Sequence, residues 1–346
     1  MSDKKANSFY QALYPRDIGL ILSYRCFSNC AHCLYNCGPG WHDWMREEEI
    51  RIALENAKGV WGEGFQVHLT GGEPFLNFPL LLKATQIAQE LAIPVYVETN
   101  AGWVKRFNTA ADRFQQLRDA GLSAVLVSVS PFHQETIPLS RTLEGIAAAR
   151  AVFGADRVII FQSQWLPEMT RRGLEKPVQI EEYIREYGVY EGGLRLWMGY
   201  GLISGGRAGY RLGDWVDKRP MEAFKSESCY EELLYAPHSH LDLYGNFIPS
   251  FCGGITLGNW HGLQGLVDGY HSKEAPHFIQ ILINRGPYGL FLEEAKKYGY
   301  QPLEGGYAGK CHLCVDLRRF FVKRSRFLEF LKPPGFYALS SDGLPD

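Results

Sequence analysis

The eight cysteines of the chain fall in two groups, one near the start and one in the second half. They are Cys26, Cys30, Cys33 and Cys37 in the early group, and Cys229, Cys252, Cys311 and Cys314 in the late group. Thiolates are the protein ligands of iron-sulfur clusters and of many structural zinc ions. No cysteine stands between residues 38 and 228. We therefore expect two separate sulfur-rich sites.

The sequence favours reduced thiols over disulfides. The N-terminal stretch MSDKKANSFYQ lacks the apolar core of a signal peptide. The most apolar later stretch, residues 78–97, is interrupted by Lys83, Gln86, Gln89 and Glu90. We expect a soluble cytoplasmic protein, in which disulfides are disfavoured. A disulfide framework would require a secreted chain.

The composition is that of an ordinary globular protein and excludes general disorder. The chain has 346 residues, of which 46% are hydrophobic and 21% charged. The formal net charge of −2 gives no overall field that would attract nucleic acid or an anionic membrane. We expect neither as a partner. The length suits one large α/β domain with an appendage, or two domains.

Apolar runs alternate with amphipathic stretches along the first 200 residues. Strands are expected at 18–24, 65–70, 94–99, 123–130, 157–163 and 194–200, and helices at 46–60, 80–91, 110–120, 143–153 and 179–188. Such alternation predicts parallel pairing with right-handed crossovers, as in an α/β barrel or an open doubly wound sheet. The ligand site should then lie at the C-terminal ends of the strands.

Polar residues and glycines follow these strands, as that placement requires. After the six strands in turn come the early cysteines, Thr70-Gly71-Gly72-Glu73-Pro74, Glu98-Thr99-Asn100, the segment from Ser128 to His133, Gln162, and GLISGGRAG with Arg207. Loops at strand ends are where chemistry concentrates. We expect these residues to form one rim.

Cys26-xxx-Cys30-xx-Cys33 after the first strand, with GGEP after the second and ETN after the third, resembles the radical S-adenosylmethionine superfamily. The resemblance implies a partial (β/α)6 barrel and a 4Fe-4S cluster held by the three cysteines. It also implies that the fourth iron binds the methionine part of S-adenosylmethionine. Such enzymes cleave this cofactor reductively to a 5′-deoxyadenosyl radical, which abstracts hydrogen from a substrate.

The resemblance also assigns expected roles around the cofactor. Glycine backbones at Gly71 and Gly72 would approach it closely, Glu73 would face its ammonium group, and Pro74 would stiffen the turn. Ribose or carboxylate contacts would come from Glu98, Thr99, Asn100, Ser128, Gln162 and Arg207. His133 would be an acid or base facing the substrate.

Several of these residues also have plain structural explanations. Thr99 and Ser128 could be helix caps, His133 could be a hydrogen-bonded loop residue, and turn formation explains the glycines near Arg207. A thiolate from Cys37 on the cluster would occupy the position that S-adenosylmethionine needs. We therefore expect Cys37 to be surplus to the cluster.

The late cysteines resemble the SPASM and twitch extensions of radical S-adenosylmethionine enzymes. A hairpin turn at Tyr244-Gly245-Asn246 precedes Cys252, then Leu257-Gly258-Asn259 and a Cys-xx-Cys pair at Cys311 and Cys314. Since a full SPASM pattern has more cysteines, the shorter twitch form with one auxiliary 4Fe-4S cluster is the better match. Four thiolates leave no open iron, which favours electron transfer or a structural role. A four-cysteine zinc site is the alternative.

Two histidines on the strand before this hairpin could replace a cysteine in either site. Because His238 and His240 alternate with other residues, we expect one ring to point inward and one outward.

The resulting expectation is an oxidoreductase or maturase with two regions. Residues 1–215 would form the barrel, and residues 216–346 the auxiliary iron-sulfur domain, with a C-terminal helix over 317–331. The substrate would be a peptide or small molecule, and the electron donor an external flavodoxin or ferredoxin. A zinc-binding interaction module and a non-catalytic iron-sulfur electron-transfer protein are the rival classes.

Overall fold

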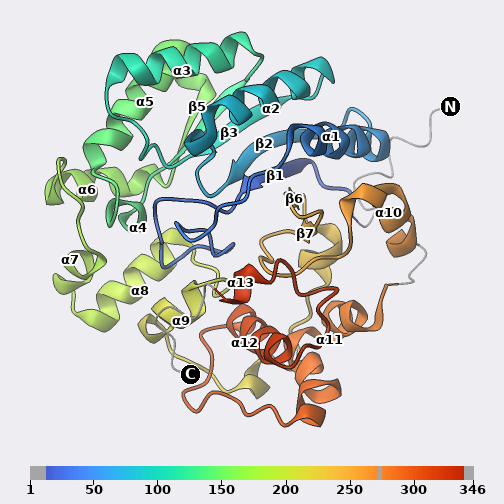
Figure 1. The fold of residues 1–346 in the computed structure, drawn as a ribbon. Helices are drawn as coiled ribbons and strands as arrows, with labels where there is room; N and C mark the ends of the chain where they lie inside the picture. The colour runs from blue at the N-terminus through green and yellow to red at the C-terminus, as the bar shows by residue number, and fades with distance from the viewer. Residues whose placement is uncertain (1–12, 272–274, 339–346) are drawn as a thin grey trace.

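The computed structural model describes residues 13–271 and 275–338, and one seven-stranded sheet organises them (Figure 1). The strand order is β5-β4-β3-β2-β1-β6-β7. Pairing is parallel from β5 through to β6, and β7 is antiparallel to β6. The bounds are β1 (Asp17–Ser23), β2 (Gln66–Gly71), β3 (Val95–Thr99), β4 (Ala124–Ser128), β5 (Val158–Phe161), β6 (His238–Asp242) and β7 (Phe247–Pro249).

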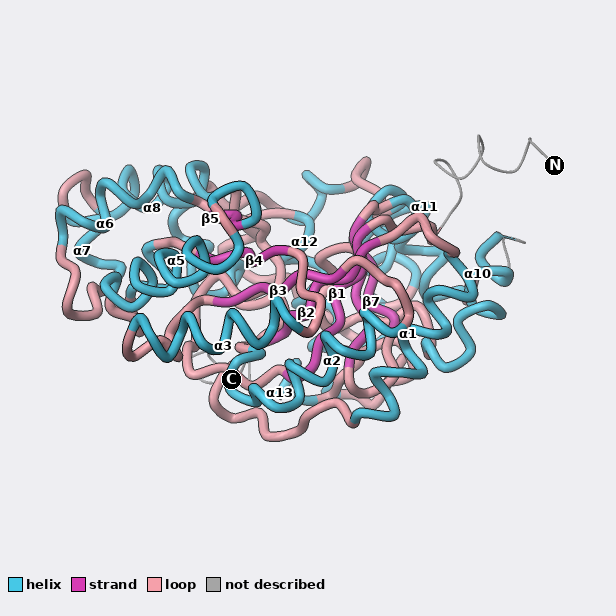
Figure 2. Tube along the Cα trace, turned by 90° about the horizontal axis from the view of Figure 1, so that it is seen from above, coloured by secondary structure: helices cyan, strands magenta, loops and turns pink. Residues whose placement is uncertain are grey.

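The predicted alternation of strand and helix is confirmed through the fifth strand. The crossover helices are α1 (Glu47–Trp61), α2 (Phe78–Glu90), α3 (Phe107–Asp119) and α5 (Leu139–Phe153). On α1, the buried residues Ile50, Leu54, Ala57 and Trp61 recur at helical spacing and form the stripe that packs on the core. Successive helices pack on each other, α1 on α2 and α3 on α5. Figures 1 and 2 show them following one another along the sheet.

The expected sixth strand at 194–200 is wrong, because these residues belong to the helix α8 (Val189–Tyr200). The buried residues of that helix, Gly193, Leu196 and Trp197, recur at spacings of three and four. Arg195, between them, turns toward Glu168 with a nitrogen-to-oxygen distance of 2.8 Å. The short run LRLWMGY concealed this period because it covers less than two helical turns.

A strand from the second half of the chain joins the sheet on the side of β1 that lies away from β5. β6 pairs in parallel with β1, and Asp17 lies opposite His238. The predicted turn at Tyr244-Gly245-Asn246 then leads into β7, with Gly245 at a φ of 87° that suits glycine. The sheet therefore crosses the boundary expected between residues 215 and 216, and the division into two domains stays a prediction.

The remaining helices lie around the sheet ends and in the second half of the chain. They are α4 (Pro131–Gln134), α6 (Leu166–Arg172), α7 (Ile180–Arg185), α9 (Ala208–Leu212), α10 (Leu263–His271), α11 (His277–Glu293), α12 (Lys310–Lys323) and α13 (Gly335–Ala338). The helix expected over 317–331 thus starts earlier, at Lys310, and ends at Lys323. Across the described residues, no helix combines the length and apolar character that crossing a membrane requires.

Candidate functional site

A cavity of about 570 Å³ opens at the C-terminal ends of the parallel strands, where the fold predicts a ligand site. Its volume lies within the range of about 300–1,000 Å³ that is usual for small-molecule and cofactor sites. The residues predicted from the sequence that line it are Cys26, Cys30, Cys33, Gly71, Gly72, Glu98, Thr99, Asn100, Ser128, His133 and Arg207. Three other predicted residues, Glu73, Pro74 and Gln162, do not line it. The expected rim is therefore largely present.

The early cysteines lie on a loop that closes on itself. The Cys26 amide donates to the Gly38 carbonyl at 3.0 Å, and the Gly38 amide donates to the Tyr24 carbonyl at 3.0 Å. Donors also point at the sulfur atoms. The Ser28 amide lies 3.4 Å from the Cys26 Sγ, and the Cys37 amide lies 3.4 Å from the Cys33 Sγ. Such donors stabilise thiolates, so the loop is built to hold anionic sulfur.

Without a bound metal, most of these sulfurs hold protons. Burial raises the pKa of Cys26 to about 12 and that of Cys30 well above its ordinary value. Hydrogen bonding by Cys37 lowers the pKa of Cys33 to about 5, while the pKa of the Cys37 thiol itself is raised. Metal binding by Cys26 and Cys30 would therefore release protons.

Arg207 holds this loop, which differs from the carboxylate contact expected from the sequence. Its buried guanidinium donates to the Cys30 carbonyl at 2.9 Å, the Asn36 Oδ1 at 3.1 Å and the Cys37 carbonyl at 2.8 Å. The preceding residue, Gly206, has a φ of 53°, and a Cβ there would lie 2.3 Å from the Cys33 carbonyl oxygen. The glycine-rich segment thus brings Arg207 against the backbone of the cysteine loop.

Positions 71 and 72 must be glycine because the backbone after β1 packs directly against them. A Cβ at Gly71, whose φ is 129°, would lie 2.1 Å from the Ser23 carbonyl oxygen. One at Gly72 would lie 1.9 Å from the Arg25 carbonyl oxygen. The Gly72 amide donates to the Ser23 carbonyl at 2.9 Å. The two glycines therefore join the end of β2 to the cysteine loop, and their backbones line the cavity from there.

The Glu73 carboxylate faces the end of β3 instead of the cavity. It accepts hydrogen bonds from the Thr99 hydroxyl at 2.9 Å, the Asn100 amide at 2.9 Å and the Phe75 amide at 3.2 Å. Burial raises the pKa of Glu73 to about 7 despite these donors. Glu73 thus fixes the Thr99-Asn100 segment. Its carboxylate does not line the cavity, so in this position it does not face the ammonium group of a cofactor bound there.

The end of β3 presents polar groups to the cavity. The Asn100 Nδ2 lies 3.5 Å from the Cys26 Sγ, and the Glu98 carboxylate accepts from the Thr70 hydroxyl at 2.8 Å. Thr99 also lines the cavity, and its hydroxyl donates to the Glu73 carboxylate.

Pro74 and Gln162 lie outside the cavity and shape the loops next to it. Pro74 opens the short 3₁₀ turn Pro74–Asn77 that leads into α2. Gln162, with a φ of 69°, donates from Nε2 to the Tyr200 carbonyl at 2.9 Å and so ties β5 to α8. Both therefore shape the loops around the cavity from outside it.

The side of the cavity next to α4 carries Ser128 and two histidines, His133 and His32. The His133 Nδ1 lies 2.7 Å from the Ser130 hydroxyl, and burial lowers the pKa of His133 to about 4. The His32 ring packs edge-on against the His133 ring, with 5.1 Å between the ring centres. Sequence reasoning missed His32, although its place between Cys30 and Cys33 was a signal that could have found it.

His238 and His240 line the cavity as well, and the expectation that their rings diverge is wrong. Their Nε2 atoms lie 3.1 Å apart. Residues two apart on a strand share a face, which explains the contact.

The four late cysteines surround a second, smaller cavity of about 40 Å³. They come from the segment before β6, the segment after β7, and α12: Cys229, Cys252, Cys311 and Cys314. Ile203 and Phe251 line both this cavity and the larger one. The two sulfur-rich sites are therefore neighbours, separated by these side chains.

Two cations accompany the late cysteines. The Lys310 Nζ lies 2.6 Å from the Glu232 carboxylate. Arg318 is buried, and among the described residues its hydrogen-bond acceptors are neutral: the Gly253 carbonyl at 2.8 Å, the Tyr337 hydroxyl at 3.2 Å and the Cys314 carbonyl at 3.4 Å. A buried cation needs negative charge nearby. Thiolates bound to a metal centre would provide it.

Comparison with known proteins gives one family match. Residues 20–161 match the family described as the Radical SAM superfamily. Among solved structures, the chain is similar to BtrN in complex with AdoMet and 2-DOIA, at 15% identity and a TM-score of 0.46, over 79% of this chain and 89% of that one. It is also similar to native anSMEcpe with bound AdoMet and Cp18Cys peptide, at 13% identity and a TM-score of 0.45, over 94% of this chain and 99% of that one. No curated protein matches the chain.

Proposed function

We propose that the protein is a radical S-adenosylmethionine enzyme acting on a peptide or small-molecule substrate, because residues 20–161 match the Radical SAM superfamily. The observation that carries the proposal is the meeting of Cys26, Cys30 and Cys33 with the ends of β2, β3 and β4 in one cavity. With a 4Fe-4S cluster and S-adenosylmethionine bound, the site would supply an electron for cofactor cleavage and a 5′-deoxyadenosyl radical for hydrogen abstraction.

The three cysteines fit a cluster with one open iron. All three line the cavity, and amide groups already point at the sulfurs of Cys26 and Cys33. Arg207 holds the backbone on which they stand. Three thiolates leave the fourth iron free for a ligand, as an open coordination position does in catalytic metal sites. The chain's task here is to fix the loop and leave that side open to the cavity.

The residues at the strand ends would bind and orient the cofactor. The backbones of Gly71 and Gly72 line the cavity, and Glu98, Asn100 and Ser128 add polar side chains. Phe161, Tyr200, Leu202 and Ile203 provide apolar walls. An apolar wall with a few polar groups is typical of a site that binds a cofactor and excludes water.

His133 is the proposed acid or base near the substrate. Its ring lines the cavity and is neutral near pH 7, since burial holds its pKa at about 4. The Ser130 hydroxyl fixes the ring through Nδ1 at 2.7 Å. At pH 7 the ring therefore has a lone pair that could serve as a base, and it carries no imidazolium proton that it could donate as an acid.

We assign the late cysteines to an auxiliary 4Fe-4S cluster of the SPASM or twitch type. All four sulfurs would be used, so this cluster would exchange electrons without binding substrate. The buried guanidinium of Arg318 supports an anionic centre there. Ile203 and Phe251 lie between the two cavities, which suits electron transfer from a substrate radical. The net reaction would be an oxidation or bond formation, as in an oxidoreductase or maturase.

The proposal includes a cytoplasmic location and an external electron donor such as flavodoxin or ferredoxin. Thiol ligands and a reductively cleaved cofactor both need a reducing compartment. A peptide and a small molecule remain two substrate classes for the same chemistry.

Anaerobic reconstitution with iron and sulfide tests the proposal against its rivals. We expect a brown protein with close to eight irons per chain, two clusters of four, that forms 5′-deoxyadenosine from S-adenosylmethionine and a reductant. A colourless chain that binds zinc at the cysteines would instead support an interaction module. A brown chain that does not cleave the cofactor would support an electron-transfer protein.

A further inference from the structure

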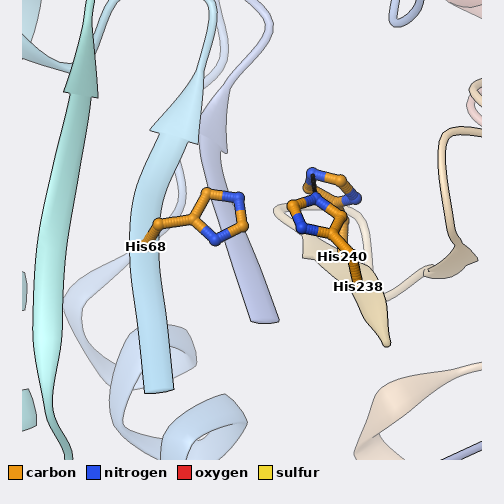
Figure 3. Close-up of side chains that lie close together, drawn as sticks. All are labelled: His68, His238 and His240. Carbon is orange, nitrogen blue, oxygen red and sulfur yellow. Dashed lines mark hydrogen bonds between the residues drawn. The ribbon is translucent and has the colours of Figure 1, made fainter. Parts of the chain in front are cut away.

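Three histidines meet on one face of the sheet, next to the large cavity. His68 comes from β2, and His238 and His240 come from β6, so β1 lies between them (Figure 3). One ligand atom from each ring lies within 4.8 Å of the other two. Gly19 on β1 pairs in register with His68 on one side and with His240 on the other. The parallel register therefore brings the rings together from strands far apart in the sequence.

Gly19 leaves the space in which these rings meet. A Cβ at this position would lie 2.1 Å from the His240 Cδ2 and 2.6 Å from the His68 Nε2. Any other residue would therefore push the two rings apart. The missing side chain on the central strand forms a cradle between His68 and His240.

A carboxylate orients His68 in the manner usual for a metal ligand. Its Nδ1 lies 2.5 Å from the Asp17 Oδ1, and Asp17 also accepts from Gln66 at 2.7 Å and from the Tyr96 hydroxyl at 3.0 Å. A carboxylate bound to Nδ1–H fixes the tautomer and leaves the Nε2 lone pair free.

The Nε2 atom of His68 is buried and has no hydrogen-bond partner among the described residues. The nearest carboxylate oxygen, on Glu98, lies 4.0 Å away, beyond hydrogen-bond distance. Since buried polar atoms are normally satisfied, an orphan nitrogen that points at two other imidazoles calls for a ligand.

His240 has a similar arrangement. The Tyr35 hydroxyl lies 3.0 Å from its Nδ1, 3.3 Å from its Nε2 and 3.3 Å from the Ser250 carbonyl oxygen. When Tyr35 donates to Ser250, it accepts from Nδ1–H of His240, and in this assigned tautomer the His240 Nε2 carries a lone pair that can accept a hydrogen bond from His238 or bind a metal ion. That atom faces the His238 Nε2 at 3.1 Å. Two of the three imidazole nitrogens are therefore already at the spacing of about 3.3 Å expected for tetrahedral zinc ligands with bonds of about 2.0–2.1 Å.

We propose that His68, His238 and His240 bind a Zn²⁺ ion at the wall of the large cavity. Three neutral imidazoles form a known ligand set for this ion, and imidazole nitrogen suits it chemically. His238 and His240 line the cavity together with Glu98, so the remaining coordination position would face the cavity. An oxygen ligand there, from water or from a hydroxyl or carboxylate of the substrate, would complete the tetrahedron. This site does not depend on the proposed radical chemistry.

Metal analysis of the full chain tests the site. After anaerobic reconstitution has occupied the cysteines, the protein is dialysed against Zn²⁺ and its zinc content measured. We expect close to one zinc per chain, and at least tenfold weaker binding in His238→Ala and His240→Ala. Asp17→Asn should weaken binding by about 10–100-fold, the effect usual for a residue that orients a ligand. His261→Ala, which changes an exposed ring on Trp260, is the matched control and should bind like the wild type.

Co²⁺ provides a readout that is independent of the clusters. The difference spectrum between the wild type and His240→Ala should show ligand-field bands without thiolate charge-transfer bands, whether or not the cysteines hold iron. Gly19→Ala, with folding checked by circular dichroism, should abolish the same bands because its methyl group fills the cradle. Equal zinc content in all variants, or a Co²⁺ difference spectrum with thiolate character, would overturn the proposal.

Discussion

Arg207→Ala removes a buried guanidinium that makes three hydrogen bonds to the cysteine loop. The acceptors are the Cys30 and Cys37 carbonyls and the Asn36 side chain, at 2.8–3.1 Å. At about 1.5–3 kcal/mol for each bond from a charged donor, the bonds would total about 4.5–9 kcal/mol if they were additive. Because Arg207 lines the cavity, water can reach part of the space it leaves. We therefore expect a loss of about 3–5 kcal/mol in the free energy of unfolding.

Urea denaturation of the anaerobic apoprotein measures this loss, and iron analysis after reconstitution measures its effect on the loop. Arg207→Lys should recover only part of the stability, since one ammonium group cannot reach three separated acceptors in the guanidinium's geometry. Arg46→Ala is the control, because its ion pair with Glu49 is exposed on the arginine side and worth about 0–1 kcal/mol.

The opposite result would restore the expectation from the sequence. If Arg207→Ala unfolds like the wild type and takes up full iron but binds S-adenosylmethionine more weakly, the residue clamps a carboxylate and our account of the loop is refuted.

Three further predictions concern the ligands and the buried carboxylate. Cys33→Ala should lose cofactor cleavage and about four irons, while Cys37→Ala should keep both; the reverse pattern would show that the ligands are misassigned. Cys314→Ala should lower iron to about one cluster and keep 5′-deoxyadenosine formation, so loss of that product would argue against a separate auxiliary site. The pKa of Glu73 is raised to about 7 in the folded protein. Its contribution to the free energy of unfolding is therefore fully present below pH ~4.5, and we expect this free energy to fall by about 3 kcal/mol as the pH rises to ~7. Glu73→Gln should flatten this dependence in urea titrations, and an unchanged slope would contradict the burial argument.

The sequence by itself determined the features that depend on local pattern. Alternating apolar runs and amphipathic stretches predict the first five strands and their helices, because the periods of two and 3.6 follow from backbone geometry. Parallel strands place their C-terminal ends at one edge, so the meeting of the cysteine loop with Gly71, Asn100 and Ser128 could be predicted without coordinates. The second group of cysteines and the turn at Gly245 were also visible in the sequence.

Only the tertiary structure decided which distant segments meet. β6 pairs with β1, whereas residues 194–200, expected as a sixth strand, form part of α8, because strand pairing depends on long-range contacts that no local period encodes. That pairing brings His238 and His240 to His68 across Gly19. Tertiary packing also places the Arg207 guanidinium against three acceptors of the cysteine loop, and the Glu73 carboxylate against the end of β3. A charged side chain can meet many partners, and which one it binds is set by burial and by where the rest of the chain places the donors and acceptors.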